Sequence, residues 1–259
     1  MRIVTANVNG IRSAADKGFF AWLVRQRADV VCLQEVRADE TRLAADRRLR
    51  PPSLHAAFHP AERKGYSGTA VYSRLAPRRV VRGAGIDWID REGRWLEAWF
   101  GNLVVVSAYL PSGSSGEARQ AFKDEALVAL GPRLDALRDQ PLPVVVCGDL
   151  NIAHTDRDVR NWRENRKSSG CLAHERTWLD ELFANGWFDA FRALEQPEHE
   201  YTWWSQRGAA RANNVGWRLD YHLAGDELAG RVLATRVYRD RIFSDHAPVA
   251  IDYALDVSA

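Results

Sequence analysis

Two short apolar segments that end in carboxylates constrain this chain more than any other feature. Residues 30–34 and 144–148 consist mainly of Val, Leu and Cys, and the acids Glu35 and Asp149 follow them directly. Apolar runs of this length between polar residues predict strands that are buried on both faces. A carboxylate at the end of such a strand is costly to desolvate unless a cation or hydrogen bonds compensate for it. The two acids therefore predict a shared cation site.

Other strand and helix patterns follow the same logic along the whole chain. We expect strands near residues 2–8, 30–34, 68–73, 80–86, 94–100, 103–110, 143–148, 219–224, 232–238 and 248–254. Three- and four-residue apolar spacing predicts helices at about 16–27, 40–48, 117–138 and 175–194. The fold class expected is α/β, with two facing sheets and helices outside, in one domain over residues 1–259. The two strand-then-acid segments lie in opposite halves, which suggests a weak internal duplication.

Composition excludes some classes of protein. The sequence has no apolar stretch near the roughly 18 residues of a membrane span, and its first residues enter a strand pattern without the regions of a signal peptide. Its 3 cysteines do not make a disulfide framework. We therefore expect a cytoplasmic protein with no membrane partner. The net charge of +2 says little about nucleic acid.

Asp149 and Asn151 lie two residues apart, as do Asn7 and Asn9. In an extended strand, residues at this spacing project to one side, so a carboxylate and an amide would share one space. The alternative is an Asx turn that closes each strand, and this alternative is stronger for Asn9 than for Asn7.

Glu35 has a second interpretation as an acid at a helix N-terminus, where the helix dipole favours it. If Glu35, Asp149 and the nearby amides bind a metal instead, their oxygen atoms favour Mg²⁺ or Mn²⁺ over zinc. The sequence has no zinc motif.

His246 could supply a general base or an electrophile, although a lone histidine is more often structural. Asp245 precedes it directly, and adjacent residues in an extended segment point to opposite sides. The carboxylate that orients His246 is therefore expected to be Asp220, at another strand boundary. Asp245 is then left for the metal.

Tyr109 ends an apolar strand pattern and could donate to a phosphate, although a strand-end aromatic is more often only interfacial. Basic and aromatic residues interleave at 157–167 and 207–218. Such segments suit phosphates and unstacked bases, but surface loops with core tryptophans explain them almost as well.

Taken together, these residues resemble the exodeoxyribonuclease III-type apurinic/apyrimidinic (AP) endonucleases of the endonuclease/exonuclease/phosphatase superfamily. The resemblance covers essentially the whole chain. The matching segments, in family order, are residues 7–12 (NVNGIR), 33–35 (LQE), 65–70 (GYSGTA), 109–111 (YLP), 148–153 (GDLNIA), 217–221 (WRLDY) and 244–248 (SDHAP).

The resemblance implies a four-layer, DNase I-like sandwich with its active site at one end, and an Mg²⁺ cofactor that Mn²⁺ could replace. It implies Glu35 as the main metal ligand, with Asn7 and Asp245 nearby. Further candidate ligands are Asp149, Asn151 and His246.

The resemblance also implies catalytic roles for five residues. Asp149 would activate or align the attacking water, and Asn151 would orient that water or bind the phosphate. His246, paired with Asp220, would hold the scissile phosphate, and Tyr109 would support it or the leaving oxygen. Cations and donors stabilise the charge of such a transition state.

By the same resemblance, Trp203, Trp217 and Leu219 form a small apolar pocket for an extruded abasic sugar, which excludes a normal base. Asn161 and Asn165 match asparagines that contact DNA phosphates.

Two departures affect which DNA end or lesion is preferred. Ser168 stands where a third asparagine is often found, and the loop 112–116 lacks the arginine that some members insert into the duplex. They leave the balance between AP-site incision and 3′-end trimming open.

Three hypotheses compete. The first is an Mg²⁺-dependent DNA-repair phosphodiesterase that cuts 5′ to abasic sites in double-stranded DNA and trims blocked 3′ ends, acting as a monomer in the cytoplasm, in association with the nucleoid. The second is a phosphatase or phosphodiesterase of the same fold that acts on inositol phosphates or lipids. The third is a non-catalytic nucleic-acid binding module, against which stand Glu35, Asp149 and His246, all of them present.

Overall fold

Two six-stranded sheets form the centre of the molecule. The computed structural model describes residues 1–258. In spatial order, the first sheet contains β13 (Val232–Val237), β14 (Val249–Tyr253), β1 (Arg2–Asn7), β2 (Val30–Gln34), β4 (Thr69–Ser73) and β3 (His55–His59). The second contains β5 (Arg79–Arg82), β6 (Trp95–Trp99), β7 (Val104–Tyr109), β8 (Val144–Asp149), β12 (Asp220–Gly225) and β9 (Trp187–Asp189). A separate short ribbon pairs β10 (Trp203–Trp204) with β11 (Gly216–Trp217).

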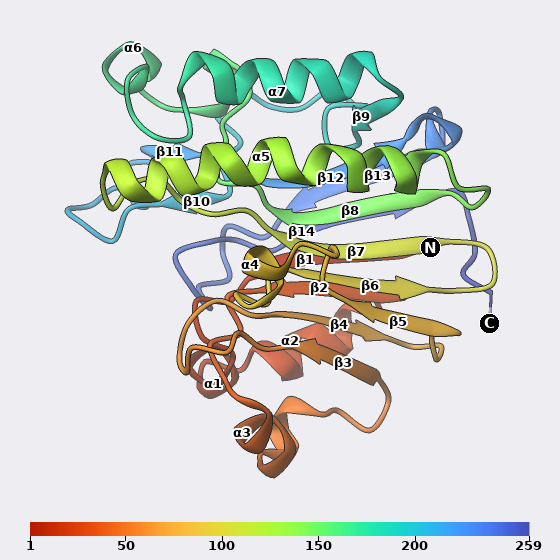
Figure 1. Ribbon diagram of the computed structural model, residues 1–259. Coiled ribbons are helices and arrows are strands. Elements are labelled where there is room, and N and C mark those ends of the chain that lie inside the picture. Colours follow the sequence, from red (N-terminus) through yellow and green to blue (C-terminus); the bar gives the residue numbers. More distant parts are fainter. Residues whose placement is uncertain (259) are drawn as a thin grey trace.

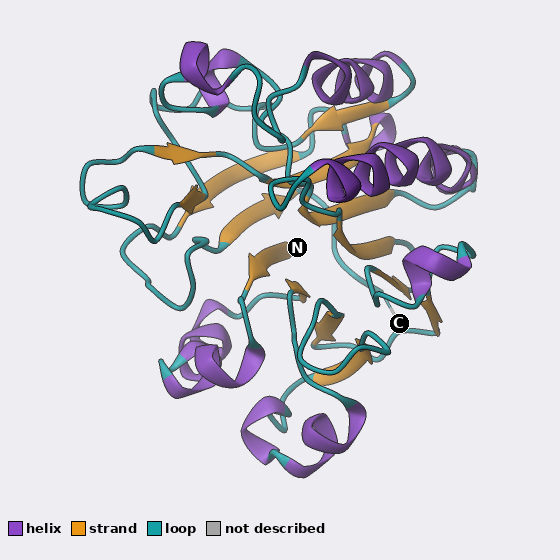
Figure 2. Cartoon of the chain, turned by 60° about the vertical axis from the view of Figure 1, so that its left-hand side comes forward, coloured by secondary structure: helices purple, strands orange, loops and turns teal. Residues whose placement is uncertain are grey.

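Helices cover the outer faces of both sheets (Figures 1 and 2). The helices are α1 (Ile11–Asp16), α2 (Phe19–Gln26), α3 (Glu40–Ala45), α4 (Asp87–Asp90), α5 (Glu117–Arg138), α6 (Trp162–Asn165) and α7 (Ala173–Ala184). Short 3₁₀ turns lie at Arg47–Leu49, Asp156–Asp158 and Asp226–Leu228. Within residues 1–258, no helix combines the length and the apolar character that crossing a membrane requires.

The two-residue alternation of strand side chains explains the four layers. In β8, Val144 and Val146 pack with the leucines of α5, while Val145 and Cys147 pack against the other sheet. In β2, Val31 packs with α1 and α2, on the opposite outer face. Both central strands are therefore buried on both sides, as their apolar runs predicted. The expected four-layer α/β sandwich is confirmed.

The same pairing pattern occurs in both sheets. Each has one parallel pair, β1–β2 in the first and β7–β8 in the second, and antiparallel neighbours on either side. This pattern fits an internal duplication, in which β1, β2, β4 and β3 take the places of β7, β8, β12 and β9. The two acid-ended strands, β2 and β8, therefore occupy equivalent positions, as the sequence interpretation suggested.

The two parallel pairs bring four strand ends to one edge of the sandwich. Asn7 pairs with Gln34 at the ends of β1 and β2, and Tyr109 pairs with Asp149 at the ends of β7 and β8. Gly148 makes the second pairing possible, because a Cβ at that position would lie 1.8 Å from the carbonyl oxygen of Ala108. The chain thus needs a glycine directly before Asp149.

Each strand expected from the sequence is present with slightly different bounds, but two expected helices are shorter than predicted. The helix expected at 16–27 is α2 and begins only at Phe19, because Gly18 takes a left-handed conformation before it (φ 82°), and α1 was not expected. The helix expected at 175–194 ends at Ala184, and β9 follows after Gly186 (φ 85°). The short strands β3, β9, β10 and β11 were not expected.

Candidate active site

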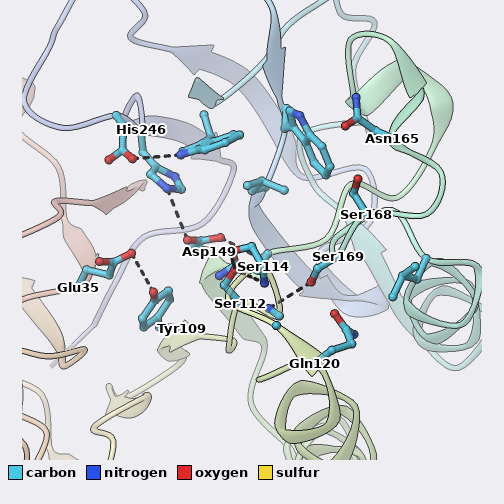
Figure 3. A pocket seen from close by; sticks show the side chains of 18 of the residues that line it. Glu35, Tyr109, Ser112, Ser114, Gln120, Asp149, Asn165, Ser168, Ser169 and His246 are labelled. Carbon is cyan, nitrogen blue, oxygen red and sulfur yellow. Dashed lines mark hydrogen bonds and ion pairs between the residues drawn. The ribbon is translucent and has the colours of Figure 1, made fainter. Parts of the chain in front are cut away.

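The strand ends open onto a cavity of about 670 Å³ (Figure 3). Two residues that the sequence singled out, Asn7 and Asp220, lie behind its lining and are each 1% exposed. The candidates that line the cavity itself are Glu35, Tyr109, Asp149, Asn151, Asn165, Trp203, Trp217, Leu219, Asp245 and His246. Residues more than 200 positions apart in the sequence thus meet in one space.

His246 lies between two carboxylates. Its Nδ1 is 2.9 Å from Asp220 Oδ2, and its Nε2 is 3.6 Å from Asp149 Oδ2. Burial lowers the pKa of His246, but Asp220 and Asp149 outweigh this effect and raise the pKa to about 10. The imidazole is therefore a cation at neutral pH, and Asp220 fixes its orientation as the sequence interpretation expected.

The positive charge around the buried Asp149 carboxyl does not offset the cost of burying its ionised form. Burial raises the pKa of Asp149 to about 7, although His246 opposes this shift. Asn7 Nδ2 donates to Asp149 Oδ2 over 2.8 Å. A carboxyl group with this pKa can accept a proton near neutral pH.

Glu35 is held from both sheets. Asn7 Nδ2 donates to Glu35 Oε1 over 2.9 Å, and the Tyr109 hydroxyl donates to the same oxygen over 2.8 Å. Arg37 forms an ion pair with the other oxygen. The helix N-terminus interpretation of Glu35 is wrong, because α3 begins only at Glu40.

The chain turns directly after β1 and β8 and does not stay extended. The Asn151 N–H donates to Asp149 Oδ1 over 2.9 Å, and the Asn9 N–H donates to Asn7 Oδ1 over 3.0 Å. Asn151 and Asn9 have φ angles of 53° and 44°. The Asx turns, which the sequence analysis kept as the alternative, are therefore present, because each acceptor oxygen captures the N–H two residues on.

Both oxygens of Asp245 have hydrogen-bond partners other than His246. Asn9 Nδ2 donates to Oδ1 over 2.8 Å, and Trp203 Nε1 donates to Oδ2 over 3.1 Å. Burial raises the pKa of Asp245, but His246 and these two donors lower it below its usual value. Asp245 thus stays ionised. Asn9, which the sequence analysis treated mainly as a turn residue, also belongs to the site.

One wall of the cavity is apolar. Trp203 and Trp217 meet edge to face with ring centroids 6.2 Å apart, and Leu219 packs beside them. Asn165 reaches the cavity, whereas Asn161 is exposed and is not part of the lining. The Asn161 carbonyl accepts a hydrogen bond from Asn165 Nδ2 over 3.0 Å.

Arg94 supports Tyr109 and was missed by the sequence analysis. Its guanidinium lies 4.5 Å from the centroid of the Tyr109 ring, and Nη1 donates to the Tyr109 carbonyl over 3.0 Å. Burial and the adjacent Glu35 raise the pKa of the Tyr109 phenol well above its usual value, so it remains a donor. Nothing in the sequence around Arg94, which lies between Gly93 and β6, indicated this contact.

A second acidic group has the spacing of a metal site. The ligand atoms of Asp124, His174 and Glu175 all lie within 4.8 Å of one another. Glu175, however, already accepts from Lys123 Nζ over 2.6 Å and from the Gly170 N–H over 2.6 Å. Because those oxygens are engaged, we regard the cavity around Glu35 as the better cation site.

Comparisons with known proteins agree with this geometry. A model described as the Endonuclease/Exonuclease/phosphatase family matches residues 4–246. An exodeoxyribonuclease of Bacillus subtilis (strain 168) is 35% identical over 97% of this chain and 98% of its own length. The DNA repair nuclease APEX1 of Danio rerio is also 35% identical, over 98% of this chain and 83% of its own length.

Solved structures show the same architecture. A 3′ phosphatase from Neisseria bound to a product DNA hairpin superposes with a TM-score of 0.90 at 26% identity and covers 98% of this chain and 100% of that one. An AP endonuclease from Archaeoglobus fulgidus has a TM-score of 0.87 at 25% identity, with the same coverage of 98% and 100%.

Proposed function

The chain belongs to the endonuclease/exonuclease/phosphatase family, and we propose that it is a DNA-repair phosphodiesterase that cuts 5′ to abasic sites in double-stranded DNA and trims 3′ ends. Its relatives are an exodeoxyribonuclease and a DNA repair nuclease, and the 3′ phosphatase that shares its fold was solved with DNA. The observation that carries the proposal is the convergence of Glu35, Asp149, Asp245 and His246 on one cavity with an apolar wall.

We infer that Mg²⁺ is the cofactor and that Mn²⁺ can replace it. The donor set fits a hard cation, because it consists of carboxylate and amide oxygens. The raised pKa of Asp149 supports this inference, since it marks a buried carboxyl that lacks compensating positive charge. When bound, the cation would neutralise charge on the phosphate and favour ionisation of water.

Glu35 would be the main ligand of this cation, with Asp245 nearby. Further candidate ligands are Asp149, Asn151 and His246. Asn7 was expected to be a ligand as well, but its amide nitrogen faces both Glu35 and Asp149. We therefore propose that Asn7 holds these two carboxylates together across the two sheets.

We propose that four side chains place the phosphate and the attacking water. His246, oriented by Asp220, would donate from Nε2 to an oxygen of the scissile phosphate. Asp149 would align the attacking water and accept its proton, as its pKa near neutrality allows. Tyr109 would donate to the phosphate or the leaving oxygen, and Asn151 would orient the water or bind the phosphate.

Substrate selection would depend on the apolar wall. A deoxyribose without a base would fit against Trp203, Trp217 and Leu219, whereas a normal nucleotide would be too large. Asn165 and the exposed Asn161 would contact phosphates of the DNA backbone. We propose that residues 1–259 form one catalytic domain that acts as a monomer in the cytoplasm. It would work on nucleoid DNA, because DNA with abasic sites or blocked 3′ ends is the proposed substrate.

A duplex with a single tetrahydrofuran lesion tests this function. We expect one Mg²⁺-dependent nick 5′ to the lesion, no nick in EDTA, and no site-specific nick in a matched duplex without the lesion. A second duplex with a 3′ phosphate should lose that phosphate. An enzyme that leaves the lesion duplex intact in Mg²⁺, or that cleaves inositol phosphates or lipid phosphodiesters instead, would refute the proposal.

A further inference from the structure

A completely buried ion pair lies behind the wall of the cavity. Lys123 of α5 and Glu175 of α7 are both 0% exposed, and Lys123 Nζ lies 2.6 Å from Glu175 Oε1. Burial lowers the pKa of Lys123, whereas Glu175 raises it again in part. Desolvating two charges is expensive, and a buried ion pair is often no more stabilising than apolar residues of the same size. Overall stability is therefore a weak explanation for the pair.

Lys123 also reaches the active site directly. Its Nζ donates to the carbonyl oxygen of Asn151 over 2.8 Å. Two further polar groups of Asn151 are engaged as well, since its N–H donates to Asp149 and its Nδ2 donates to the Leu110 carbonyl over 2.9 Å. Asparagine tolerates a left-handed φ of 53° better than most residues, and the bond from Lys123 to the Asn151 carbonyl helps to hold the backbone there.

Glu175 holds the neighbouring part of the wall. Its Oε2 accepts from the Gly170 N–H over 2.6 Å and from the Leu172 N–H over 3.0 Å. Ser168 and Ser169, which precede Gly170, line the cavity. Glu175 therefore fixes the loop from which this side of the cavity is built.

Gly170 connects this loop to Asn151 and to the apolar wall. A Cβ at Gly170 would lie 2.9 Å from the Asn151 carbonyl oxygen and 3.1 Å from the ring of Trp217. The loop, Asn151 and Trp217 are thus in close contact, so a shift of the loop must move at least one of the other two.

We propose that Lys123 and Glu175 form a positioning pair, which sets the place of Asn151 and of the wall at residues 168–172 relative to Asp149. The inference rests on the proposed nuclease function. Neither Lys123 nor Glu175 lines the cavity, so neither needs to touch the substrate. A misplacement of about 1 Å at a reacting centre can cost about 10²-fold in rate.

The test removes both charges together, so that no unpaired buried charge is left behind. We expect the double variant Lys123→Met, Glu175→Gln to lower kcat on the tetrahydrofuran duplex by roughly 10²-fold, with a much smaller change in KM. The KM should change little because Asn161, which would contact a phosphate of the DNA backbone, lies outside the segment 168–172 that the pair positions.

The matched control is a second pair on the same helix. Arg133 of α5 donates from Nε to Glu97 Oε1 over 2.8 Å, and the Glu97 side chain is 0% exposed. Neither residue lines the cavity. The double variant Arg133→Met, Glu97→Gln should lose stability but keep the wild-type kcat.

The outcomes separate the two proposals. If the wild-type enzyme does not nick the lesion duplex, the proposed function fails. If the wild type nicks but both double variants keep its kcat, or both lose it equally, the positioning pair is refuted. Should the double variant not fold, Glu175→Gln alone, which keeps the shape and one acceptor, must still lower kcat more than Glu97→Gln does, and an equal effect contradicts the inference.

Discussion

Two buried ionic clusters each include acids from the second sheet, and they differ in how their charge is balanced. In the first, Asp158 Oδ1 accepts from Arg218 Nε over 2.7 Å and from Arg192 Nη2 over 2.6 Å, and Arg218 Nη2 lies 2.7 Å from Asp189. In the second cluster, the single imidazole of His246 lies between the carboxylates of Asp149 and Asp220. Burial raises the pKa of Asp158, but the two arginines outweigh it and hold the pKa well below its usual value.

The comparison shows what distinguishes a structural cluster from a reactive one. Two arginines match the charges of Asp158 and Asp189, so that cluster is complete within the protein. Asp149 and Asp220 share one His246, and the pKa of Asp149 rises to about 7. The unbalanced negative charge favours binding of a cation, and the raised pKa allows proton transfer at neutral pH.

The largest expected effect separates the two clusters by activity. Asp149→Ala should lower cleavage of the lesion duplex by roughly 10³-fold or more and leave the fold intact, because the water loses its acceptor. Asp158→Asn should keep most of the activity once folded. Steady-state kinetics with circular dichroism of each variant would check this, and near-normal turnover by Asp149→Ala would rule out its assigned role.

A somewhat smaller loss of activity is expected when the imidazolium of His246 is replaced. His246→Gln should lower kcat by roughly 10²- to 10³-fold, because a neutral amide replaces the imidazolium that would hold the phosphate. Single-turnover rates on the same duplex measure this loss. If the variant lowers only the melting temperature and keeps kcat, the histidine is structural.

The complete cluster should matter for stability instead. Asp158→Asn leaves Arg218 buried with less compensating charge, which should cost about 3–5 kcal/mol of unfolding free energy at pH 7. Urea unfolding measures this cost. Arg138→Ala, which removes an exposed ion pair with Asp135, is the control and should change stability by less than about 1 kcal/mol. Equal effects of the two substitutions would contradict the comparison.

The smallest effect is the pH dependence of that stability difference. A carboxyl whose pKa is depressed in the folded state stabilises the protein fully above its unfolded pKa of about 3.9, and the stabilisation is lost as pH falls below that value. The stability gap between wild type and Asp158→Asn should therefore be constant from about pH 7 to 5 and narrow below about pH 4. A gap that widens in acid would show that Asp158 is not stabilised as an anion.

The sequence predicted the central strands because their apolar runs report burial on both faces, and β2 and β8 are examples. It did not predict β10 and β11, because strands of two residues carry no periodic signal. It placed the start of α2 before Gly18, because the apolar spacing continues through that residue, although a glycine can leave the helical conformation there.

The sequence also predicted only part of the candidate active site. The pairing of His246 with Asp220 was predictable from the opposite directions of neighbouring side chains in a strand. The bond from Asn9 to Asp245 and the ion pair of Lys123 with Glu175 were not, since these partners lie far apart in the sequence and each residue taken alone resembles an ordinary turn or surface residue. The Asx turn at Asn151 was visible as an alternative, but local spacing could not decide between it and an extended strand.

We propose above all that the unbalanced carboxylates at the strand ends bind the catalytic cation. An anomalous difference map from a crystal soaked in Mn²⁺ tests it most directly, because the chain offers a second acidic group with suitable spacing. We expect a peak beside Glu35, within the cavity that Asp149 and Asp245 line. A peak only at Asp124, His174 and Glu175, with none beside Glu35, would contradict it.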